Sequence, residues 1–460
     1  MKFIMKIPFH ITLLVGKAVA NIAKLVDKNR GTNISGKIAT ALCNDFVKHF
    51  KNIDFSKVIM VTGTNGKSTT TNLIAHTIKQ SNRKTATNGE GANMMGGVAT
   101  TLIKNSTLTG KFNKEFLVLE IDERSLPSIY KVLPAKNLVI TNLQKDQVQR
   151  NGDPDFIYRK FAEVINKDIV LFLNNEEPRS KGLEDKAGQV IYFSVNKNDE
   201  SFNKSNFYDI TMPCPKCNHI IKYEYFNLES IGKFYCTNCN YSSEEKPDIY
   251  VSNIDSEGNK IICNNETYSI TYNTPFYIYN YAATVSVSKK IGLTEEEINQ
   301  GFKTFVNPGE RREILKYKDK VIHYLRMKQE NPETLQSALD TVAKDKTEKA
   351  IFIGLYEVKD FLPYYSNTFY FYDCNFKDIA NTPVEKYIVF SKTVCYDTAN
   401  RIIYDGADPS KIEIYDYEED ISVILKKMDD IKTKNIYILT GMKPYSNIKN
   451  FLAEEEKANG

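Results

Sequence analysis

The chain has 460 residues, which is enough for two or three domains that each bury a core of their own. Its 61 basic and 57 acidic residues nearly balance, and this excludes the strong overall charge expected of a protein that binds nucleic acid or an acidic polymer. Binding specificity must therefore come from local groups, and we predict no nucleic-acid partner.

The first 50 residues are predicted to be mainly helical. Residues 1–26 are apolar but are interrupted by four lysines and a histidine, and no uninterrupted run of about 18 apolar residues is present to span a bilayer. A secretory signal also fits poorly, because the longest apolar run in this segment, Ile11–Val15, is short. We expect an amphipathic helix that packs on the protein, and the alternative is a helix that lies on a membrane surface. The predicted location is the cytoplasm, under the second reading at the inner face of the membrane.

A phosphate-binding loop is predicted next. An apolar strand at residues 58–62 leads into the run Gly63-Thr64-Asn65-Gly66-Lys67-Ser68-Thr69, and a helical pattern follows. The glycines let backbone N–H groups crowd around a polyphosphate, the lysine brings a positive charge to the β- and γ-phosphates, and the serine hydroxyl is a ligand for Mg²⁺. The glycines are two residues closer together than in the common Gly-x-x-x-x-Gly-Lys loop. This shorter form resembles the ATP site of the Mur ligase superfamily, enzymes that join amines to carboxylates through acyl phosphates.

Strands and helices alternate after this loop, which predicts an α/β fold. Short apolar runs at residues 116–121, 137–141 and 168–173 are typical of strands buried on both faces of a parallel sheet. Open α/β sheets bind ligands at the C-terminal ends of their strands. Glu120, at the end of the first run, is therefore the candidate Mg²⁺ ligand, and Asn142, after the second, is a candidate cofactor-binding residue. For Glu120 the alternative is a solvated acid at a strand end.

Two Cys-x-x-Cys pairs within a polar stretch at residues 196–260 predict a zinc ribbon over about residues 211–247. The ligands would be Cys214, Cys217, Cys236 and Cys239. Each pair can present two thiolates, and the 18 residues between the pairs return the chain as a hairpin. Four sulfur ligands leave no open position, so a Zn²⁺ ion here would be structural. Two disulfides or free thiols are the alternative, which the scattered pattern of the other cysteines, typical of a cytosolic protein, disfavours.

A hinge is predicted at the run Pro308-Gly-Glu-Arg-Arg-Glu313. It separates an ATP-binding domain at residues 51–307 from a C-terminal α/β domain at residues 308–460. In the latter we expect a helix at residues 332–344 and strands at 350–353, 387–390 and 435–439. Arg311 and Arg312 in the hinge are candidates to contact nucleotide phosphates, with surface ion pairs as an equal alternative.

Taken together, these motifs are similar to the MurT family, the ligase subunits of lipid II isoglutaminyl synthase. The shared segments are the phosphate loop, residues 91–94, 119–123 and 141–152, and the cysteine pairs. The resemblance implies a Mur ligase-like central domain with ATP and Mg²⁺ as cofactors and with Lys67 and Glu120 as catalytic residues. It also implies ATP-dependent amidation of the D-glutamate α-carboxylate of the lipid II stem peptide to D-isoglutamine, in peptidoglycan synthesis.

The resemblance further implies a heterodimer with a GatD-like glutaminase that supplies ammonia. In this family an aspartate of the C-terminal domain completes the glutaminase's Cys-His pair, and the chain departs from the family pattern in that segment. Asp360 is the candidate for this role, and Asn367 lies near the expected spacing. The departure leaves open a Mur-like carboxylate–amine ligase that acts without a glutaminase on another acceptor. A nucleotide-binding scaffold protein is a third reading, which Lys67, Ser68 and Glu120 disfavour.

Overall fold

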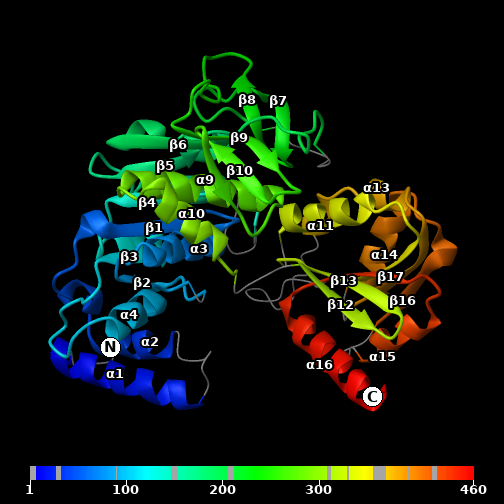
Figure 1. The fold of residues 1–460 in the computed structure, drawn as a ribbon, viewed down its shortest axis with the longest axis horizontal. Coiled ribbons are helices and arrows are strands. Elements are labelled where there is room, and N and C mark those ends of the chain that lie inside the picture. The colour runs from blue at the N-terminus through cyan, green and yellow to red at the C-terminus, as the bar shows by residue number, and fades with distance from the viewer. Residues whose placement is uncertain are drawn as a thin grey trace, which may run out of the picture. The chain divides into compact units, whose positions relative to one another are not determined.

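The computed structural model describes residues 7–26, 33–89, 91–146, 154–205, 212–307, 312–328, 331–355, 369–391, 394–416 and 422–459. These residues form two compact units (Figure 1). The first unit contains the described residues up to Asn307, except Lys145, Asp146 and Ser205. Those three residues belong to the second unit, together with the described residues from Arg312 onward.

A nine-stranded sheet in the order β11-β10-β9-β6-β5-β4-β1-β3-β2 forms the centre of the first unit. Its strands are parallel from β2 to β9 along that order, whereas β10 and β11 are antiparallel to their neighbours. The strands are β1 Val58–Thr62, β2 Thr85–Thr87, β3 Phe116–Glu120, β4 Asn137–Ile140, β5 Val170–Asn174, β6 Gln189–Val195, β9 Ile249–Asp255, β10 Lys260–Cys263 and β11 Glu266–Ser269. The three runs predicted as buried strands are thus present as β3, β4 and β5.

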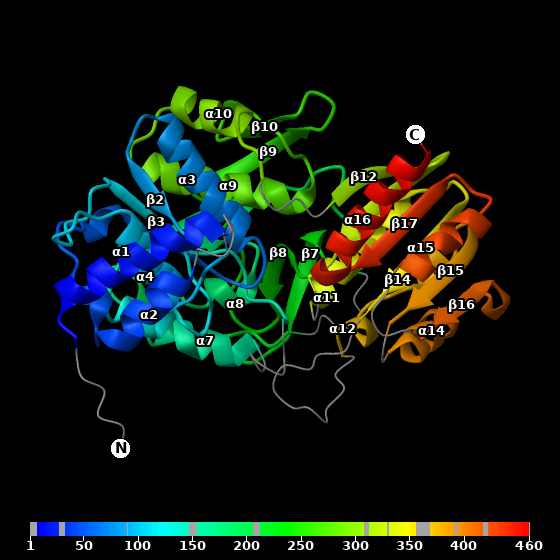
Figure 2. The same cartoon turned by 90° about the horizontal axis from the view of Figure 1, so that it is seen from below.

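Helices cover both faces of this sheet (Figures 1 and 2). Along β1, Val58 and Met60 pack into the core on one face, whereas Ile59 and Val61 pack into the core on the other. This alternation explains why the strand is apolar throughout. The first core lies under α1 Phe9–Val26, α2 Ile34–Leu42, α4 Met95–Lys104, α5 Leu126–Tyr130 and α7 Pro154–Ala162, and the second under α3 Lys67–Gln80, α9 Pro275–Lys290 and α10 Glu295–Lys303. Shorter helical turns are α8 Pro178–Lys181 and the 3-10 segments Phe46–His49, Phe55–Lys57 and Glu184–Lys186.

The cysteine-containing insertion forms a separate two-stranded hairpin, β7 Ile221–Leu228 and β8 Ile231–Cys236. It lies between β6 and β9 in sequence. The polar stretch predicted at residues 196–260 is wider than this insertion, because β9 lies within it and pairs with β6 in the main sheet. In β9, Ile249 and Val251 are buried while Ser252 and Asn253 are exposed. Because successive side chains of a strand point to opposite faces, the second half of β9 is exposed on both faces, and its polar composition concealed the strand in the sequence.

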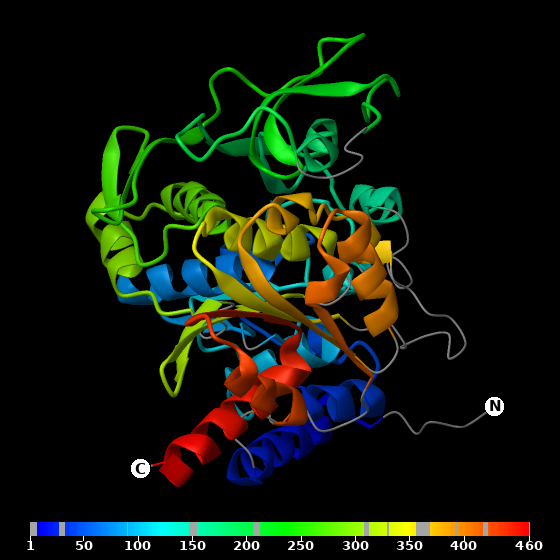
Figure 3. The same ribbon diagram turned by 90° about the vertical axis from the view of Figure 1, so that its right-hand side faces the viewer.

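The second unit contains a six-stranded sheet in the order β12-β13-β17-β14-β15-β16, parallel except for β12 (Figure 3, yellow to red). Along β14, Ile351 and Ile353 pack into one core, and Ala350 and Phe352 into another on the opposite face. The strands are β12 Arg312–Tyr317, β13 Lys320–Arg326, β14 Lys349–Gly354, β15 Val384–Phe390, β16 Ile412–Tyr415 and β17 Asn435–Thr440. The helices are α11 Pro332–Lys344, α12 Phe369–Tyr372, α13 Lys377–Ala380, α14 Cys395–Tyr404, α15 Ser422–Lys426 and α16 Met442–Asn459, with 3-10 segments at Pro409–Lys411 and Lys427–Asp430.

The helix and the strands that the sequence predicted for this second region are present as α11, β14, β15 and β17. In the part of the chain that the structure describes, no helix combines the length and the apolar composition needed to cross a membrane.

Candidate nucleotide site and metal centre

The phosphate loop joins the C-terminal end of β1 to the first turn of α3. Gly63 has a φ of +123° and Gly66 a φ of +84°, and both values lie in the region that favours glycine. A Cβ atom on Gly63 would lie 2.3 Å from the Oγ1 atom of Thr141, and one on Gly66 would lie 2.6 Å from the Oδ1 atom of Asn280. Both glycines are therefore required by backbone conformation and by space, so the shape of the loop depends on them.

Polar side chains that follow β4 hold the loop in position. The backbone N–H of Asn65 donates to Oδ1 of Asn142 at 2.9 Å, and Nδ2 of Asn142 donates to the carbonyl oxygen of Asn65 at 3.1 Å. The side-chain amide of Asn65 in turn donates to Oε1 of Gln144 at 2.8 Å. Asn142, predicted as a cofactor-binding residue, thus binds the loop itself, and Gln144 is a second support that the sequence did not single out.

Lys67 is buried at the start of α3. Its Nζ atom donates to the carbonyl oxygens of Gly63 and Thr64, the latter at 3.1 Å, and forms an ion pair with Oε1 of Glu123 at 2.7 Å. A lysine predicted to meet phosphates therefore has a buried carboxylate beside it. The sequence did not identify Glu123 as this partner, because Glu123 is one of three acids at or just after the end of β3 and no spacing rule distinguishes them. Ser68 and Thr69, on the first turn of the same helix, are exposed and half-buried.

Glu120 ends β3 with only 3% of its surface exposed. Its Oε1 atom accepts a hydrogen bond from Nδ2 of Asn93 at 3.1 Å, whereas its buried Oε2 atom has no hydrogen-bond partner among the residues that the structure describes. A buried carboxylate oxygen without a donor is unfavourable unless a ligand supplies positive charge. The alternative of a solvated acid is wrong for this residue, and its oxygen fits the preference of Mg²⁺ for carboxylate ligands.

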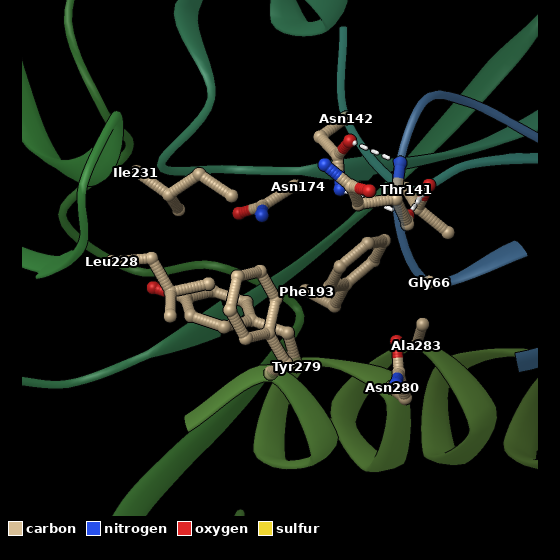
Figure 4. A pocket seen from close by; sticks show the side chains of 12 residues that line it. Gly66, Thr141, Asn142, Asn174, Phe193, Leu228, Ile231, Tyr279, Asn280 and Ala283 are labelled. Carbon is tan, nitrogen blue, oxygen red and sulfur yellow. Dashed lines mark hydrogen bonds between the residues drawn. The ribbon is translucent and has the colours of Figure 1, made fainter. Parts of the chain in front are cut away.

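A pocket lies beside the loop within the first unit (Figure 4), and the space in it that no atom fills is about 300 Å³ when the open solvent at its mouth is counted. Phe193 and Tyr279 bring aromatic rings to it, and Asn174 and Asn280 bring side-chain amides. The Nδ2 atom of Asn174 is buried and lacks a hydrogen-bond partner in the described ranges. The full lining is Asn65, Gly66, Thr141, Asn142, Asn174, Phe193, Leu228, Ile231, Phe276, Tyr279, Asn280 and Ala283.

The tip of the β7–β8 hairpin forms one wall of this pocket. Leu228 and Ile231, which flank the turn between the strands, both line it (Figure 4). Between them, the Ser230 hydroxyl accepts a hydrogen bond from Nε2 of Gln144 at 2.9 Å. Because Gln144 also binds the side chain of Asn65, the hairpin tip is connected to the phosphate loop.

A buried acid connects the same hairpin to α9. The side chain of Glu176 accepts hydrogen bonds from the Tyr279 hydroxyl at 2.7 Å, from the Val195 N–H at 2.9 Å and from Nδ2 of Asn227 at 3.2 Å. Its carbonyl oxygen accepts from the N–H of Gly232 in β8 at 3.0 Å. Burial raises the pKa of the Glu176 carboxyl from 4.5 to about 7, although the hydrogen bonds oppose this shift. No sequence motif pointed to this residue.

The four cysteines of the insertion meet at the other end of the hairpin. Their Sγ atoms all lie within 4.8 Å of one another, with 3.8 Å between Cys214 and Cys239 and 3.5 Å between Cys217 and Cys236. Thiolates at about 2.3 Å from a central ion in a tetrahedron lie about 3.8 Å apart, whereas disulfide sulfurs lie about 2 Å apart. None of the four forms a disulfide bond. The disulfide alternative is therefore wrong, and the cluster fits a tetrahedral metal ion.

The contacts described above do not involve the other site residues that the sequence predicted. Arg311, Asp360 and Asn367 lie outside the described residues, and Arg312 begins β12 with its side chain outside them. Their predicted roles therefore stay predictions.

The fold defines the class of protein. A family model described as the Mur ligase middle domain matches residues 61–243. The structure is similar to that of a pseudomurein peptide ligase type C from Methanothermus fervidus, with a TM-score of 0.67 and 18% identity over 94% of this chain and 85% of that chain. It is also similar to MurF ligase from Thermotoga maritima in complex with ADP, with a TM-score of 0.58 and 15% identity over 93% of this chain and 85% of that chain. The protein therefore has the Mur ligase fold, as predicted.

More specific matches define the family. A family model described as the MurT ligase C-terminal matches residues 329–443. The chain is 30% identical over 384 residues, 83% of each protein, to the lipid II isoglutaminyl synthase (glutamine-hydrolyzing) subunit MurT of Staphylococcus aureus. It is 29% identical over 282 residues to the subunit of that name from Streptococcus pneumoniae, 59% of this chain and 61% of that protein. The chain belongs to the MurT family, and the resemblance inferred from its motifs is confirmed.

Proposed function

We propose that this protein is the ligase subunit of a lipid II isoglutaminyl synthase. It would use ATP to amidate the D-glutamate α-carboxylate of the lipid II stem peptide, giving D-isoglutamine for peptidoglycan. The observation that carries this proposal is the 30% identity to the Staphylococcus aureus subunit, which extends over 83% of both chains. The geometry of the loop, the pocket and Glu120 supplies the chemistry.

The phosphate loop would bind the triphosphate of ATP. Backbone N–H groups at the N-terminus of α3 favour negative charge there. Lys67 already lies in the loop, so a change of partner from the loop carbonyls to phosphate oxygens would bring its charge to the phosphoryl group in transfer. Ser68 and Glu120 would hold Mg²⁺, which neutralises phosphate charge when it is bound.

The pocket beside the loop would hold the adenine base. Aromatic rings and side-chain amides together suit a flat heterocycle with donors and acceptors at its edge. The buried amide nitrogen of Asn174 supports this assignment, because a base nitrogen would provide the acceptor that it lacks.

The reaction would proceed in two displacements. An oxygen of the acceptor carboxylate attacks the γ-phosphorus, the bond to the β-phosphate oxygen breaks, and ADP leaves. Ammonia then attacks the carbonyl carbon of the acyl phosphate, phosphate departs, and the nitrogen gives up a proton to form the amide. Lys67 and the loop N–H groups stabilise the charge that develops in the first step.

A GatD-like glutaminase would form a heterodimer with this chain and supply the ammonia. The relatives' names describe a subunit of a glutamine-hydrolysing enzyme, which supports a partner of this kind. In the proposal Asp360 completes the partner's Cys-His pair, and Zn²⁺ occupies the four-cysteine cluster. The complex would act in the cytoplasm, at the inner face of the membrane that carries the lipid-linked acceptor.

The test is an amidation assay with lipid II, ATP and either glutamine plus the glutaminase or added ammonium. We expect ADP and amidated lipid II in both cases. Asp360→Asn should suppress synthesis from glutamine but spare synthesis from ammonium, because only the orientation of the partner's histidine is disturbed. Synthesis from ammonium alone, with no response to a glutaminase, would instead favour a Mur-like ligase that acts without one. Absence of ADP formation with lipid II would reject the proposal.

A further inference from the structure

Helix α1 exposes several large apolar side chains on the face that is turned away from the protein. The face that packs inward contains Phe9 and Leu13 together with the small or polar residues Thr12, Gly16 and Ala20. The outward side chains follow the helical spacing of three and four residues, and between 37% and 60% of their surface is exposed. They are Ile11, Leu14, Val15 and Ile22. Large apolar side chains gathered on the outer face of a surface helix indicate an apolar or amphipathic neighbour.

Helix α2 also exposes apolar side chains. It packs against α1, and the two helices lie side by side in Figure 2. Ile34 and Ile38, one helical turn apart, are 45% and 36% exposed. Lys37 is exposed between them.

The charge of this region differs from that of the whole chain. Residues 1–42 contain seven lysines and arginines and one acidic residue, Asp27, although the complete chain is nearly balanced. Lys17 holds α1 to the body of the protein, because its ammonium group donates hydrogen bonds to the carbonyl oxygens of Ile103 and Ser106, each at 2.7 Å. The inner side of α1 therefore holds the helix to the body of the protein, and the sequence of this segment has an excess of basic residues, among which Lys17 faces inward and Lys37 is exposed.

We propose that the exposed face of α1 and α2, formed by Ile11, Leu14, Val15, Ile22, Ile34 and Ile38, lies on an anionic lipid bilayer. Apolar side chains that enter the interface, combined with lysines that meet acidic headgroups, are the two attractions that hold a helix in the plane of a membrane. The excess of basic residues favours a lipid surface over a neutral protein surface. This inference rests on the proposed function, whose acceptor is a lipid, and it names the surface by which the enzyme reaches that acceptor.

The test is flotation of the purified full-length chain with vesicles of phosphatidylglycerol and phosphatidylcholine, and with phosphatidylcholine vesicles alone. We expect binding to the anionic vesicles that weakens in high salt and is much weaker on the neutral ones. The double variant Leu14→Gln/Ile22→Gln should lower the partition coefficient at least tenfold. The matched control is Ile220→Gln/Val423→Gln, because these side chains are 52% and 59% exposed, as Leu14 and Ile22 are 52% and 60% exposed. It should bind like wild type, and circular dichroism should show that both variants are folded.

Each other outcome overturns the inference. Equal flotation of wild type and Leu14→Gln/Ile22→Gln would mean that this face does not touch lipid. If wild type does not float but forms a dimer that the Leu14→Gln/Ile22→Gln variant does not form, the face is an interface between two copies of the chain. Amidation of detergent-solubilised lipid II separates this inference from the proposed function. Activity without flotation rejects only the membrane surface, whereas flotation without activity rejects the function.

Discussion

The phosphate loop and the tip of the β7–β8 hairpin border the same pocket, but only the loop has a sequence from which its role could be predicted. The loop consists of residues that its task requires: two glycines with positive φ and a lysine followed by a serine. The tip, Leu228-Glu-Ser-Ile231, has ordinary residues that would suit many hairpins. A loop that touches phosphate is constrained in residue type, whereas a wall of a pocket is constrained mainly in position.

The tip and the cysteines lie at opposite ends of the hairpin. Ile221 pairs with Cys236 at the base, and Leu228 pairs with Ile231 at the tip. The Ser230–Gln144 hydrogen bond then fastens the tip to the residues that hold the loop. The four-cysteine cluster and the pocket beside the loop are therefore at the two ends of one hairpin, and the predictions below test how strongly each end matters.

The largest effect should come from the loop. Lys67→Ala should lower amidation at least a hundredfold, because it removes positive charge from the phosphoryl group in transfer. It also leaves Glu123 buried without its ion-pair partner, which destabilises the protein. The measurement is the rate of lipid II amidation, with thermal unfolding recorded for each variant.

The double variant Lys67→Ala/Glu123→Gln separates these two effects, because it removes the unpaired charge. It should recover stability but not activity. Lys79→Ala, an exposed position on the last turn of α3, is the control and should behave as wild type. Activity of Lys67→Ala above a tenth of the wild-type rate would refute the assigned role.

The loss of metal should have the next largest effect. The purified chain should hold one Zn²⁺ ion, and Cys236→Ser should lose it. The loss should lower the melting temperature. It should also weaken ATP binding about tenfold, because the hairpin that forms one wall of the pocket is then less firmly held. Metal analysis and titration calorimetry with ATP measure both results. Cys43→Ser, at a cysteine outside the cluster, should retain metal and affinity. A metal-free protein of unchanged stability and ATP affinity would show that the cluster does not support the pocket.

The tip itself should contribute less than the metal that positions it. Leu228→Ala and Ser230→Ala should each weaken ATP binding about threefold to tenfold, which corresponds to about 1 kcal/mol for a lost apolar contact or hydrogen bond. Tyr235→Ala, on an exposed part of β8 near the cysteines, is the control and should leave the affinity unchanged. An affinity that is the same in all three variants would mean that the tip merely lies beside the nucleotide.

These contrasts show what the sequence could predict. Gly63, Gly66 and the four cysteines were identified because each occupies a position that few residue types can fill, and the buried strands were identified because both of their faces are apolar. Glu123 and Glu176 were not identified, because their partners come from distant segments and no local pattern marks a buried acid. The hairpin tip was missed for the same reason. Contacts that depend on tertiary structure leave no short spacing to detect.

The smallest expected effect is the pH dependence of stability that Glu176 introduces. Its pKa is about 7 in the folded protein and 4.5 ordinarily, because burial disfavours the charged carboxylate. A raised folded-state pKa contributes stability that is complete below about pH 4.5 and is lost as the pH rises through 7. Glu176→Gln cannot ionise and removes this dependence. We therefore expect the melting temperature of wild type, relative to Glu176→Gln, to fall by a few degrees between pH 5 and pH 8.

The difference between the two proteins is the quantity to follow, because Glu176→Gln also alters the hydrogen bonds from Tyr279 and Val195 and so shifts stability at every pH. Glu184→Gln is the control, since it changes another acid of the first unit and should leave the slope between pH 5 and pH 8 as in wild type. If wild type and Glu176→Gln keep a constant difference over this range, the carboxylate is ionised throughout, and the hydrogen bonds that it accepts outweigh its burial. ATP affinity measured at the same pH values would then show no step near pH 7, although Tyr279 lines the pocket and binds this acid.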